Sequence, residues 1–415
     1  MNCGCGNCDA HPSGDDTPGH ISSELTPIVT GVRVPRAGLT AELQAFLDEH
    51  PTDAETWHRL GIALNAEGRY DEAVTAHHSA LTLSPHNLRV ECDYAYSLAA
   101  RGDLAHASAL LEEIIQRDPG NGWAYFHLAS ARYRQNACQD AATFWECAAR
   151  CLDDPSDCFE NLAMAYRRLG DEERERSCWQ RLAERKPDSP AVEHMLAAVG
   201  VTAPRSRASD AYVTELFDRF ASDFDRVLDV LGYAVPEIAE SWIRAAHPEP
   251  DRTLRILDAG CGTGLCGLRL APWADHLTGV DLSPQMLARA AERDVYDRIV
   301  EAEIVAFLLD HPSSFDVIVA GDVLCYFGDL RPFGEAAIRA LTPSGRLAFS
   351  VEATDPSEHA DEGYLMRAHG RYAHARAHVE ASLGTSQQLR VIETTLRLEA
   401  GSPVQGFWVD AMRPK

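Results

Sequence analysis

Apolar positions in the first half of the chain recur at helical spacing and are interrupted at a fixed interval. The interrupting turn residues stand 34 positions apart, at Gly68, Gly102, Asn136 and Gly170. The segment "WHRLGIALNAEGRYDEAVTAHHSALTLSP" (57–85) contains two amphipathic stretches joined by a Gly-Arg turn. Because self-similarity at this period indicates a repeated structural unit, the pattern predicts four consecutive helix pairs.

The period and phase of these helix pairs resemble the tetratricopeptide repeat over about 54–189. Amphipathic stretches at 39–50 and 190–200 are expected to cap the array, which gives a helical domain over 37–200. The resemblance implies a concave surface that binds a protein or peptide. A second interpretation, in which the repeats only stabilise or dimerise the protein, stays open.

The second half of the chain alternates apolar runs with helical segments. The runs that are expected to form strands are 254–260, 276–283, 315–324, 345–353, 389–399 and 406–412. Segments such as 284–294 and 331–341 separate the earlier runs and have helical periodicity. This alternation predicts a doubly wound (Rossmann-like) α/β domain over 212–415, behind a polar linker at 201–211, with ligands bound at the carboxyl ends of its strands.

An aromatic stripe precedes the first of these strands. Tyr212, Phe217, Phe220 and Phe224 lie five, three and four positions apart, which places them along one face of a helix. Two interpretations are open: the stripe faces the core, or the helix covers a ligand pocket with its aromatic rings turned toward the ligand.

The loop "ILDAGCGTGLCG" (256–267) is the strongest chemical signal in the chain. Its glycines fit the dinucleotide fingerprint when counted from Gly262, and an alternating pattern when counted from Gly260. Asp258 argues against a dinucleotide, because this carboxylate would repel a pyrophosphate by roughly 4 kcal/mol at 4 Å. A ligand that carries an ammonium group would be attracted. S-adenosylmethionine has that group, a sulfonium and a ribose, and no phosphate.

The sequences "LDAGCGTG" and "LTGVDLSPQML" resemble the cofactor loops of class I S-adenosylmethionine-dependent methyltransferases. The wider chain, about 54–413, resembles bacterial methyltransferases that carry tetratricopeptide repeats. The resemblance implies that Asp258 holds the ammonium group and that Asp281 accepts both ribose hydroxyls. The remaining residues implied in cofactor binding are Gly260, Gly262, Gly264, Leu282, Glu303, Ile304 and Phe224, with Glu303 on the adenine amino group and Leu282 and Ile304 on its faces.

Asp322 and Tyr326 follow the fourth strand run and are the candidate catalytic residues. Asp322 would orient the methyl acceptor or act as a base, or it would simply cap the next helix. The segment 369–380 collects basic side chains, namely His369, Arg371, His374, Arg376 and His378. They would line an acceptor pocket and favour a carboxylate substrate, or they would form a solvated or structural helix face.

Two cysteine groups raise the question of a metal. Cys3, Cys5 and Cys8, with His11, could hold zinc as soft ligands, or they are incidental thiols of a tail spanning 1–36. Cys147, Cys151 and Cys158 lie close together in sequence, but burial in helices is the preferred interpretation.

The net charge of −25 argues against nucleic acids and anionic membranes as partners. Because no apolar run approaches the length of a membrane span, a cytoplasmic location is expected. The sequence thus predicts a methyltransferase for a small-molecule or protein-bound acceptor, with the repeats binding a protein partner. The alternatives are an adaptor whose cofactor domain does not turn over and an NAD-dependent oxidoreductase, which Asp258 disfavours.

Overall fold

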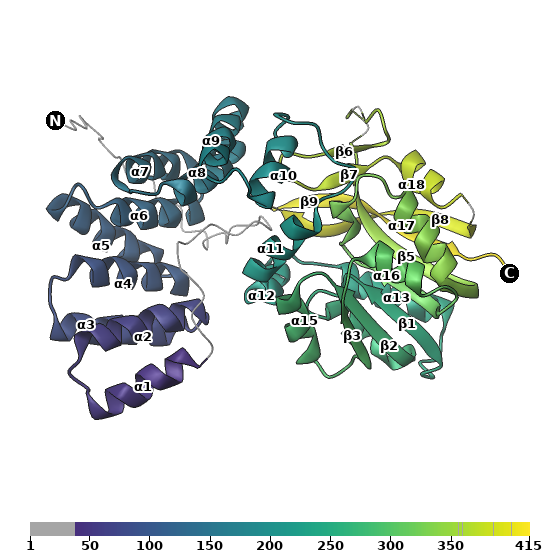
Figure 1. Cartoon of the computed structure of the whole chain (residues 1–415), viewed down its shortest axis with the longest axis horizontal. Coiled ribbons are helices and arrows are strands. Elements are labelled where there is room, and N and C mark those ends of the chain that lie inside the picture. The colour runs from purple at the N-terminus through teal and green to yellow at the C-terminus, as the bar shows by residue number, and fades with distance from the viewer. Residues whose placement is uncertain (1–37, 356, 359, 385, 400) are drawn as a thin grey trace.

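The computed structural model describes residues 38–415 except 356, 359, 385 and 400. The predicted metal ligands Cys3, Cys5 and Cys8, and His11 beside them, lie outside the described residues. Figure 1 shows a stack of helices at the N-terminal side and a sheet covered by helices at the C-terminal side. Among the described residues, no helix is long and apolar enough to cross a membrane.

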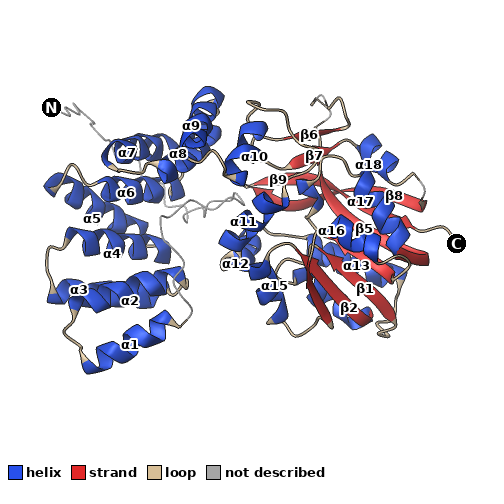
Figure 2. Cartoon of the chain, in the orientation of Figure 1, coloured by secondary structure: helices blue, strands red, loops and turns tan. Residues whose placement is uncertain are grey.

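Ten helices form the N-terminal stack of the described chain (Figure 2). They are α1 (Leu39–Glu49), α2 (Ala54–Ala66), α3 (Tyr70–Leu83), α4 (Leu88–Arg101), α5 (Leu104–Arg117), α6 (Gly122–Arg134), α7 (Cys138–Cys151), α8 (Ser156–Leu169), α9 (Glu172–Arg185) and α10 (Pro190–Ala198). Helices α2 to α9 form four antiparallel pairs, with α1 and α10 at the two ends. The predicted all-helical repeat architecture is confirmed.

Local chemistry accounts for where these helices begin and end. The turn residues at the 34-residue positions all adopt positive φ: Gly68 (73°), Gly102 (110°), Asn136 (62°) and Gly170 (71°). Glycine and asparagine tolerate this conformation, which other residues avoid. The first helices of three repeats begin with a side-chain cap, in which Asp53, Asn87 and Asn121 each accept a backbone N–H three residues ahead.

A buried polar cluster lies inside the first repeats. The Nε2 atom of His58 stands 2.6 Å from a carboxylate oxygen of Asp93, and the Nδ1 atom of His77 stands 2.9 Å from the Ser97 hydroxyl. Burial lowers the pKa of His77 to about 4, and the pKa of His127 also to about 4. Both imidazoles are therefore neutral at pH 7, which allows them to sit among apolar residues.

Three helices lead from the repeats into the sheet: α11 (Asp210–Phe220), α12 (Phe224–Val230) and α13 (Val235–Ala246). The strands are β1 (Leu254–Ala259), β2 (Ala274–Asp281), β3 (Arg298–Glu301), β4 (Phe315–Ala320), β5 (Leu341–Ala353), β6 (Tyr364–Met366), β7 (Tyr372–His374), β8 (Gln387–Glu399) and β9 (Ser402–Met412). The flanking helices are α14 (Leu265–Leu270), α15 (Pro284–Ala291), α16 (Ile304–Asp310), α17 (Arg331–Ala340) and α18 (Arg376–Ser382).

The strands form one sheet whose central part is parallel, in the order β3-β2-β1-β4-β5. Strand β9 is antiparallel to both β5 and β8, and the short β6–β7 hairpin extends the C-terminal end of β5. Each of the six predicted strand runs corresponds to a strand. The sequence patterns missed β3, β6 and β7, which are only three or four residues long and carry too few alternations to show a period.

The repeat stack packs against the sheet domain through its last helices. The His194 ring of α10 stacks on Tyr212 of α11 at 3.9 Å, and its Nε2 atom lies 2.7 Å from the carbonyl oxygen of Gly370. The Arg167 side chain of α8 donates a hydrogen bond to the carbonyl oxygen of Ala368 at 3.0 Å. The turn before β7 therefore contacts two helices of the repeat stack.

Candidate functional site

A pocket that is partly open to solvent lies at the carboxyl ends of the parallel strands. Four strand ends supply its floor and walls: Gly260 and Gly262 after β1, Asp281 and Leu282 at β2, Glu303 and Ile304 after β3, and Gly321, Asp322 and Val323 after β4. Helices α11 and α12 cover it. This location is the one that a doubly wound sheet favours for ligands.

The glycine loop after β1 brings its backbone to the edge of the pocket. Gly260 has a φ of 74°, and its N–H donates to the carbonyl oxygen of Val280 at 2.7 Å. A Cβ atom on Gly260 would lie 2.5 Å from a methyl carbon of Val323. The loop therefore requires glycine here for conformation and for space.

Asp281 holds the glycine loop and also lines the pocket. One carboxylate oxygen accepts the N–H of Gly262 and the other accepts the N–H of Ser283, both at 2.9 Å. Burial raises the pKa of Asp281, and these backbone N–H groups act in the opposite direction. Each carboxylate oxygen can accept a further hydrogen bond, so the group can still receive hydroxyl donors from a ligand.

Glu303 carries an acceptor without a partner. Its Oε2 atom accepts the N–H of Ala306 at 2.8 Å and caps α16, while its Oε1 atom is buried and has no hydrogen-bond partner among the described residues. Because buried acceptors without a donor are rare, this atom beside the pocket indicates that a bound ligand supplies the missing donor. Leu282 and Ile304 line the same region and present apolar surface.

The aromatic stripe is split between two surroundings. Phe217, Phe220 and Phe224 line the pocket and contact one another edge to face, with ring centres 6.1 Å apart for Phe217–Phe224 and 5.4 Å for Phe220–Phe224. Tyr212 does not line this pocket and packs on His194 instead. The interpretation of aromatic rings that cover a ligand pocket therefore holds for the later three rings. They lie on two helices and not on one, because Phe224 begins α12.

The structure corrects the position expected of Asp258. Its side chain is 1% exposed and does not line the pocket; one oxygen accepts the Tyr296 hydroxyl at 2.7 Å. Burial raises the pKa of Asp258 to about 6, and the Tyr296 hydroxyl and the Gly267 N–H oppose this rise. Asp258 thus stabilises the glycine loop and does not face a ligand, because its side chain is buried and lies outside the pocket lining.

Gly264 is also displaced from its expected role. It is the N-terminal cap of α14 with a φ of 91°, and it does not line the pocket. A Cβ atom there would stand 3.0 Å from Arg293 and Tyr296, so the residue serves helix packing. Of the three loop glycines, Gly260 and Gly262 are the ones at the pocket.

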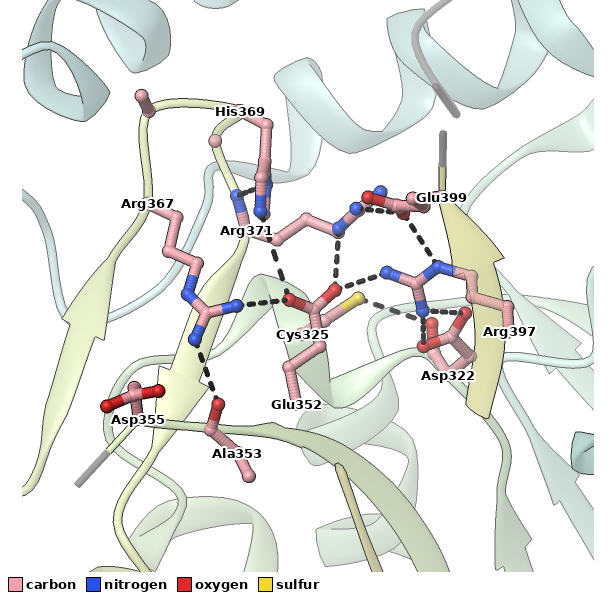
Figure 3. Close-up of polar contacts among 12 residues, drawn as sticks. Asp322, Cys325, Glu352, Ala353, Asp355, Arg367, His369, Arg371, Arg397 and Glu399 are labelled. Atoms are coloured by element: carbon pink, nitrogen blue, oxygen red, sulfur yellow. Dashed lines mark hydrogen bonds and ion pairs between the residues drawn. The ribbon is translucent and has the colours of Figure 1, made fainter. Parts of the chain in front are cut away.

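Asp322 lines the pocket, but its carboxylate is paired with an arginine of β8 (Figure 3). Both of its oxygens accept hydrogen bonds from Arg397 of β8, at 2.9 Å each, and its backbone has a φ of 55°. Burial raises the pKa of Asp322, and the positive charge of Arg397 counteracts this rise. The expectation that Asp322 serves as a base is corrected, because its oxygens are engaged with a fixed cation.

Arg397 belongs to a buried ionic cluster that also contains Glu352, Arg371 and Glu399 (Figure 3). Arg397 is fully buried and Glu352 is 1% exposed at the side chain, and the Nε atom of Arg371 stands 2.7 Å from Glu352. Burial by itself raises the pKa of Glu352, but the two guanidinium groups outweigh it and hold the pKa below its usual range. The cluster joins β5 and β8 to the residue that directly precedes β7.

The basic segment 369–380 does not form an anion site. Arg371 forms ion pairs with Glu352 and Glu399. Burial lowers the pKa of His374 to about 4, and its ring is hydrogen-bonded to the carbonyl oxygen of Phe327 at 2.8 Å. None of its residues lines the pocket. The expectation of an acceptor pocket lined by this segment is therefore corrected, and the structural alternative holds, with part of the segment in β7.

Tyr326 lines the pocket as expected, and Tyr233 joins it although no sequence pattern singled it out. Tyr326 follows β4 in a short 3-10 turn, whereas Tyr233 comes from the segment between α12 and α13. Tyr233 reaches the end of β4, since its hydroxyl lies 3.8 Å from the place of a Cβ on Gly321. Only the tertiary fold brings these residues together.

The described cysteines do not indicate a metal centre. Cys158 is buried in the repeat core, Cys147 is half-buried and Cys151 is exposed. Among the described residues, no group of histidine, cysteine or acidic side chains is arranged to hold a metal ion. The helical-burial interpretation applies to Cys158.

The sheet order, the glycine loop and the acid at the end of β2 define the class of the C-terminal domain as a class I methyltransferase fold. Residues 257–347 match the protein-family model described as a methyltransferase domain. Residues 37–158 match the tetratricopeptide-repeat domain of cytochrome c-type biogenesis protein H, and residues 157–189 match a tetratricopeptide repeat. The N-terminal part of the chain therefore matches tetratricopeptide-type repeats, and the C-terminal part matches a methyltransferase domain.

Individual proteins resemble parts of this chain. Human methyltransferase-like protein 27 is 40% identical over 152 residues, which are 33% of this chain and 62% of that protein. The malonyl-[acyl-carrier protein] O-methyltransferase of Enterobacter lignolyticus is 36% identical over 25% of this chain and 41% of that protein. A solved S-adenosylmethionine-dependent methyltransferase of Mesorhizobium loti is 25% identical over 42% of this chain and 98% of that one, with a TM-score of 0.33. The chain spans less than two thirds of the length of these two curated relatives.

Proposed function

We propose that this protein transfers a methyl group from S-adenosylmethionine to an oxygen nucleophile on a small or protein-bound acceptor. The observation that carries the proposal is the pairing of Asp281 with the unpartnered Oε1 atom of Glu303 in one apolar pocket. Asp281 matches a ribose diol and Glu303 matches an exocyclic amino group, so together they fit an adenosine. A relative named as an O-methyltransferase supports oxygen as the acceptor atom.

The lining of the pocket fits this cofactor in further respects. Leu282 and Ile304 offer apolar faces for a purine, and the backbone at Gly260 and Gly262 leaves room for close approach. Phe224 would cover the ligand, since its ring lies 3.8 Å from the place of a Cβ on Gly262. The aromatic rings can also stabilise a sulfonium through cation–π attraction.

S-adenosylmethionine supplies a methyl group that is already electrophilic. The chain then needs only to bind, orient and exclude water, because alignment of the reacting atoms accounts for much of the acceleration in such transfers. Phe217, Phe220 and Phe224 provide the dry cover over the pocket. Asp281 and Glu303 fix the nucleoside end and so set where the methyl group points.

We also propose that the repeats bring a protein partner or a protein-bound acceptor to the pocket. The contacts of α8 and α10 with the 368–370 turn support this arrangement, because they hold the repeat stack in a fixed relation to the catalytic domain. An adaptor role, in which the cofactor domain binds without turnover, is the second candidate that the repeats favour.

Calorimetric titration of S-adenosylmethionine, S-adenosylhomocysteine and NADH into the full chain tests the cofactor. Both adenosyl compounds should bind and NADH should not. Asp281→Asn should weaken binding by about tenfold or more, because one acceptor is replaced by a donor. Asp275→Asn, on an exposed position of the same strand, is the matched control and should bind as the wild type does.

Failure of the folded wild type to bind either adenosyl compound would overturn the proposal. Binding of NADH in their place would favour the oxidoreductase. Adenosyl binding that Asp281→Asn leaves intact would show that the nucleoside lies elsewhere.

A further inference from the structure

The end of the pocket at β4 carries two tyrosines, Tyr233 and Tyr326, whose hydroxyls the proposed function does not yet use. Tyr326 is 6% exposed, and Tyr233 packs among apolar residues of α12 and α13. Both residues line the pocket, and among the described residues neither hydroxyl has a hydrogen-bond partner. A hydroxyl that belongs to a pocket-lining residue and has no protein partner is available to hydrogen-bond a ligand.

Both phenols act as donors at neutral pH. Burial raises the pKa of Tyr233 and of Tyr326 well above the ordinary value, and the negative charge of Asp322 adds to the rise in both. A protonated phenol in apolar surroundings offers its proton to an anionic oxygen and forms a stronger bond there than to a neutral one.

The carboxylate at the same end of the pocket, Asp322, is already paired with a fixed cation. Both oxygens of Asp322 are bound by Arg397, and burial raises the pKa of the Cys325 thiol, whose sulfur lies 3.3 Å from the carbonyl oxygen of Asp322. Asp281 and Glu303 stand at the strand ends that we assign to the nucleoside. An acceptor that must lose a proton, such as an alcohol, would have to pass it to a carboxylate whose ionised form Arg397 stabilises.

We infer that the methyl acceptor is a carboxylate on an apolar body, held by the hydroxyls of Tyr233 and Tyr326. This inference rests on the proposed function and names the substrate class of the same site. Phe217 and the ring of Tyr326, whose centres lie 5.5 Å apart, supply the surface for the apolar body.

The transfer is chemically complete without any further group. A carboxylate oxygen forms the new bond to the methyl carbon while the carbon–sulfur bond breaks, and that electron pair stays on sulfur. The products are a methyl ester and the neutral thioether S-adenosylhomocysteine, and no proton moves. Because an anion and a cation are both consumed, an apolar pocket favours the reaction more than water does.

The test uses the full chain saturated with S-adenosylhomocysteine, into which octanoate and octanol are titrated separately. Octanoate should bind at least about tenfold more tightly than octanol, because hydrogen bonds to a charged group contribute more than those to a neutral one. Tyr233→Phe and Tyr326→Phe should each reduce octanoate affinity by about tenfold and leave octanol affinity and S-adenosylhomocysteine affinity unchanged. Tyr364→Phe, whose hydroxyl bonds Glu362 away from the pocket, is the control.

Equal affinity for octanoate and octanol, or no binding of octanoate, would overturn the carboxylate inference. So would octanoate binding that neither phenylalanine variant weakens. The initial binding of S-adenosylhomocysteine separates this failure from failure of the proposed function, since without it the methyltransferase assignment itself falls. With S-adenosylmethionine in place of the thioether, octanoate should be converted to its methyl ester, and methylation of octanol instead would also overturn the inference.

Discussion

Arg397 donates hydrogen bonds from one guanidinium nitrogen to both carboxylate oxygens of Asp322, at 2.9 Å each, at a point where Asp322 lines the ligand pocket. The two residues are 75 positions apart in sequence. The position of Asp322 in the sequence suggests a base, but its ion pair with Arg397 makes the carboxylate a structural part of the pocket wall.

Asp322→Asn should lower stability more than it changes chemistry. The substitution keeps the shape of the side chain but leaves Arg397 with less negative charge around it, so we expect a loss of about 3 kcal/mol, at the low end for a broken buried ion pair. Chemical denaturation measures this loss. Asp329→Asn, which weakens a pair with the exposed Arg331, should cost about 1 kcal/mol or less. A fully stable Asp322→Asn protein with abolished turnover would instead restore the role of a base.

Glu303→Gln should weaken S-adenosylhomocysteine binding by about tenfold while keeping α16 capped. The glutamine oxygen can still accept the Ala306 N–H, but its amide group then turns a donor toward the adenine amino group, where Glu303 has its free acceptor. Calorimetry with the inosine analogue of the ligand gives the control. The variant should lose less affinity for that analogue, whose oxo group accepts a hydrogen bond. Equal losses for both ligands would place the purine elsewhere.

Gly260→Ala should abolish ligand binding through a clash with Val323. The added Cβ would lie 2.5 Å from a Val323 methyl carbon, and the φ of 74° adds about 1–2 kcal/mol of backbone strain. Combining it with Val323→Ala removes the clash and leaves the strain, so the double variant should recover part of the affinity. Additive losses of the two single variants would contradict this contact.

Gly61→Ala should destabilise the repeats although glycine is replaced by a better helix former. The new Cβ would stand 2.4 Å from Nε2 of the buried His77, which costs about 1–3 kcal/mol. Gly68→Asn is the control, because Asn136 has the same left-handed conformation at the equivalent position of the third repeat. It should be almost neutral in thermal unfolding. A stabilising effect of Gly61→Ala would contradict the packing around His77.

Acidification should destabilise the repeat stack through His77 and His127. Their folded pKa of about 4 lies below the unfolded value near 6.5, so the unfolded chain binds more protons between these values and stability falls as pH drops through 6.5 toward 4. Each histidine contributes up to roughly 3 kcal/mol. Unfolding midpoints at pH 7.0 and 5.0 should therefore differ more in the wild type than in His77→Gln/His127→Gln.

The comparison of variants is needed because Asp258 titrates in the same range with the opposite sign. Its folded pKa of about 6 lies above the unfolded value, so protonation of Asp258 favours the folded state as pH falls. That contribution is common to both proteins and cancels in the difference. An identical pH dependence of the two proteins would contradict the prediction.

The sequence could predict the architecture because local features carry it. The turn residues at a 34-residue spacing, the helix caps such as Asn87 and Asn121, and the apolar runs of the main strands each act over a few neighbouring positions. The glycine loop and Asp281 were likewise recognisable, since a strand, a tight turn and an acid follow one another at characteristic intervals.

The tertiary structure decided what individual side chains do. Asp258 has a structural role because it is buried and bonded to Tyr296, which is 38 positions away in sequence. Asp322 also has a structural role, because β8 places Arg397 within hydrogen-bond distance of its carboxylate. Tyr233 entered the pocket from a segment without a chemical motif. The sequence by itself determined the elements and the kind of pocket, through short-range periodicity and turn chemistry. Which carboxylates face a ligand and which face another residue depended on long-range packing, because burial and partners set the state of an ionisable group.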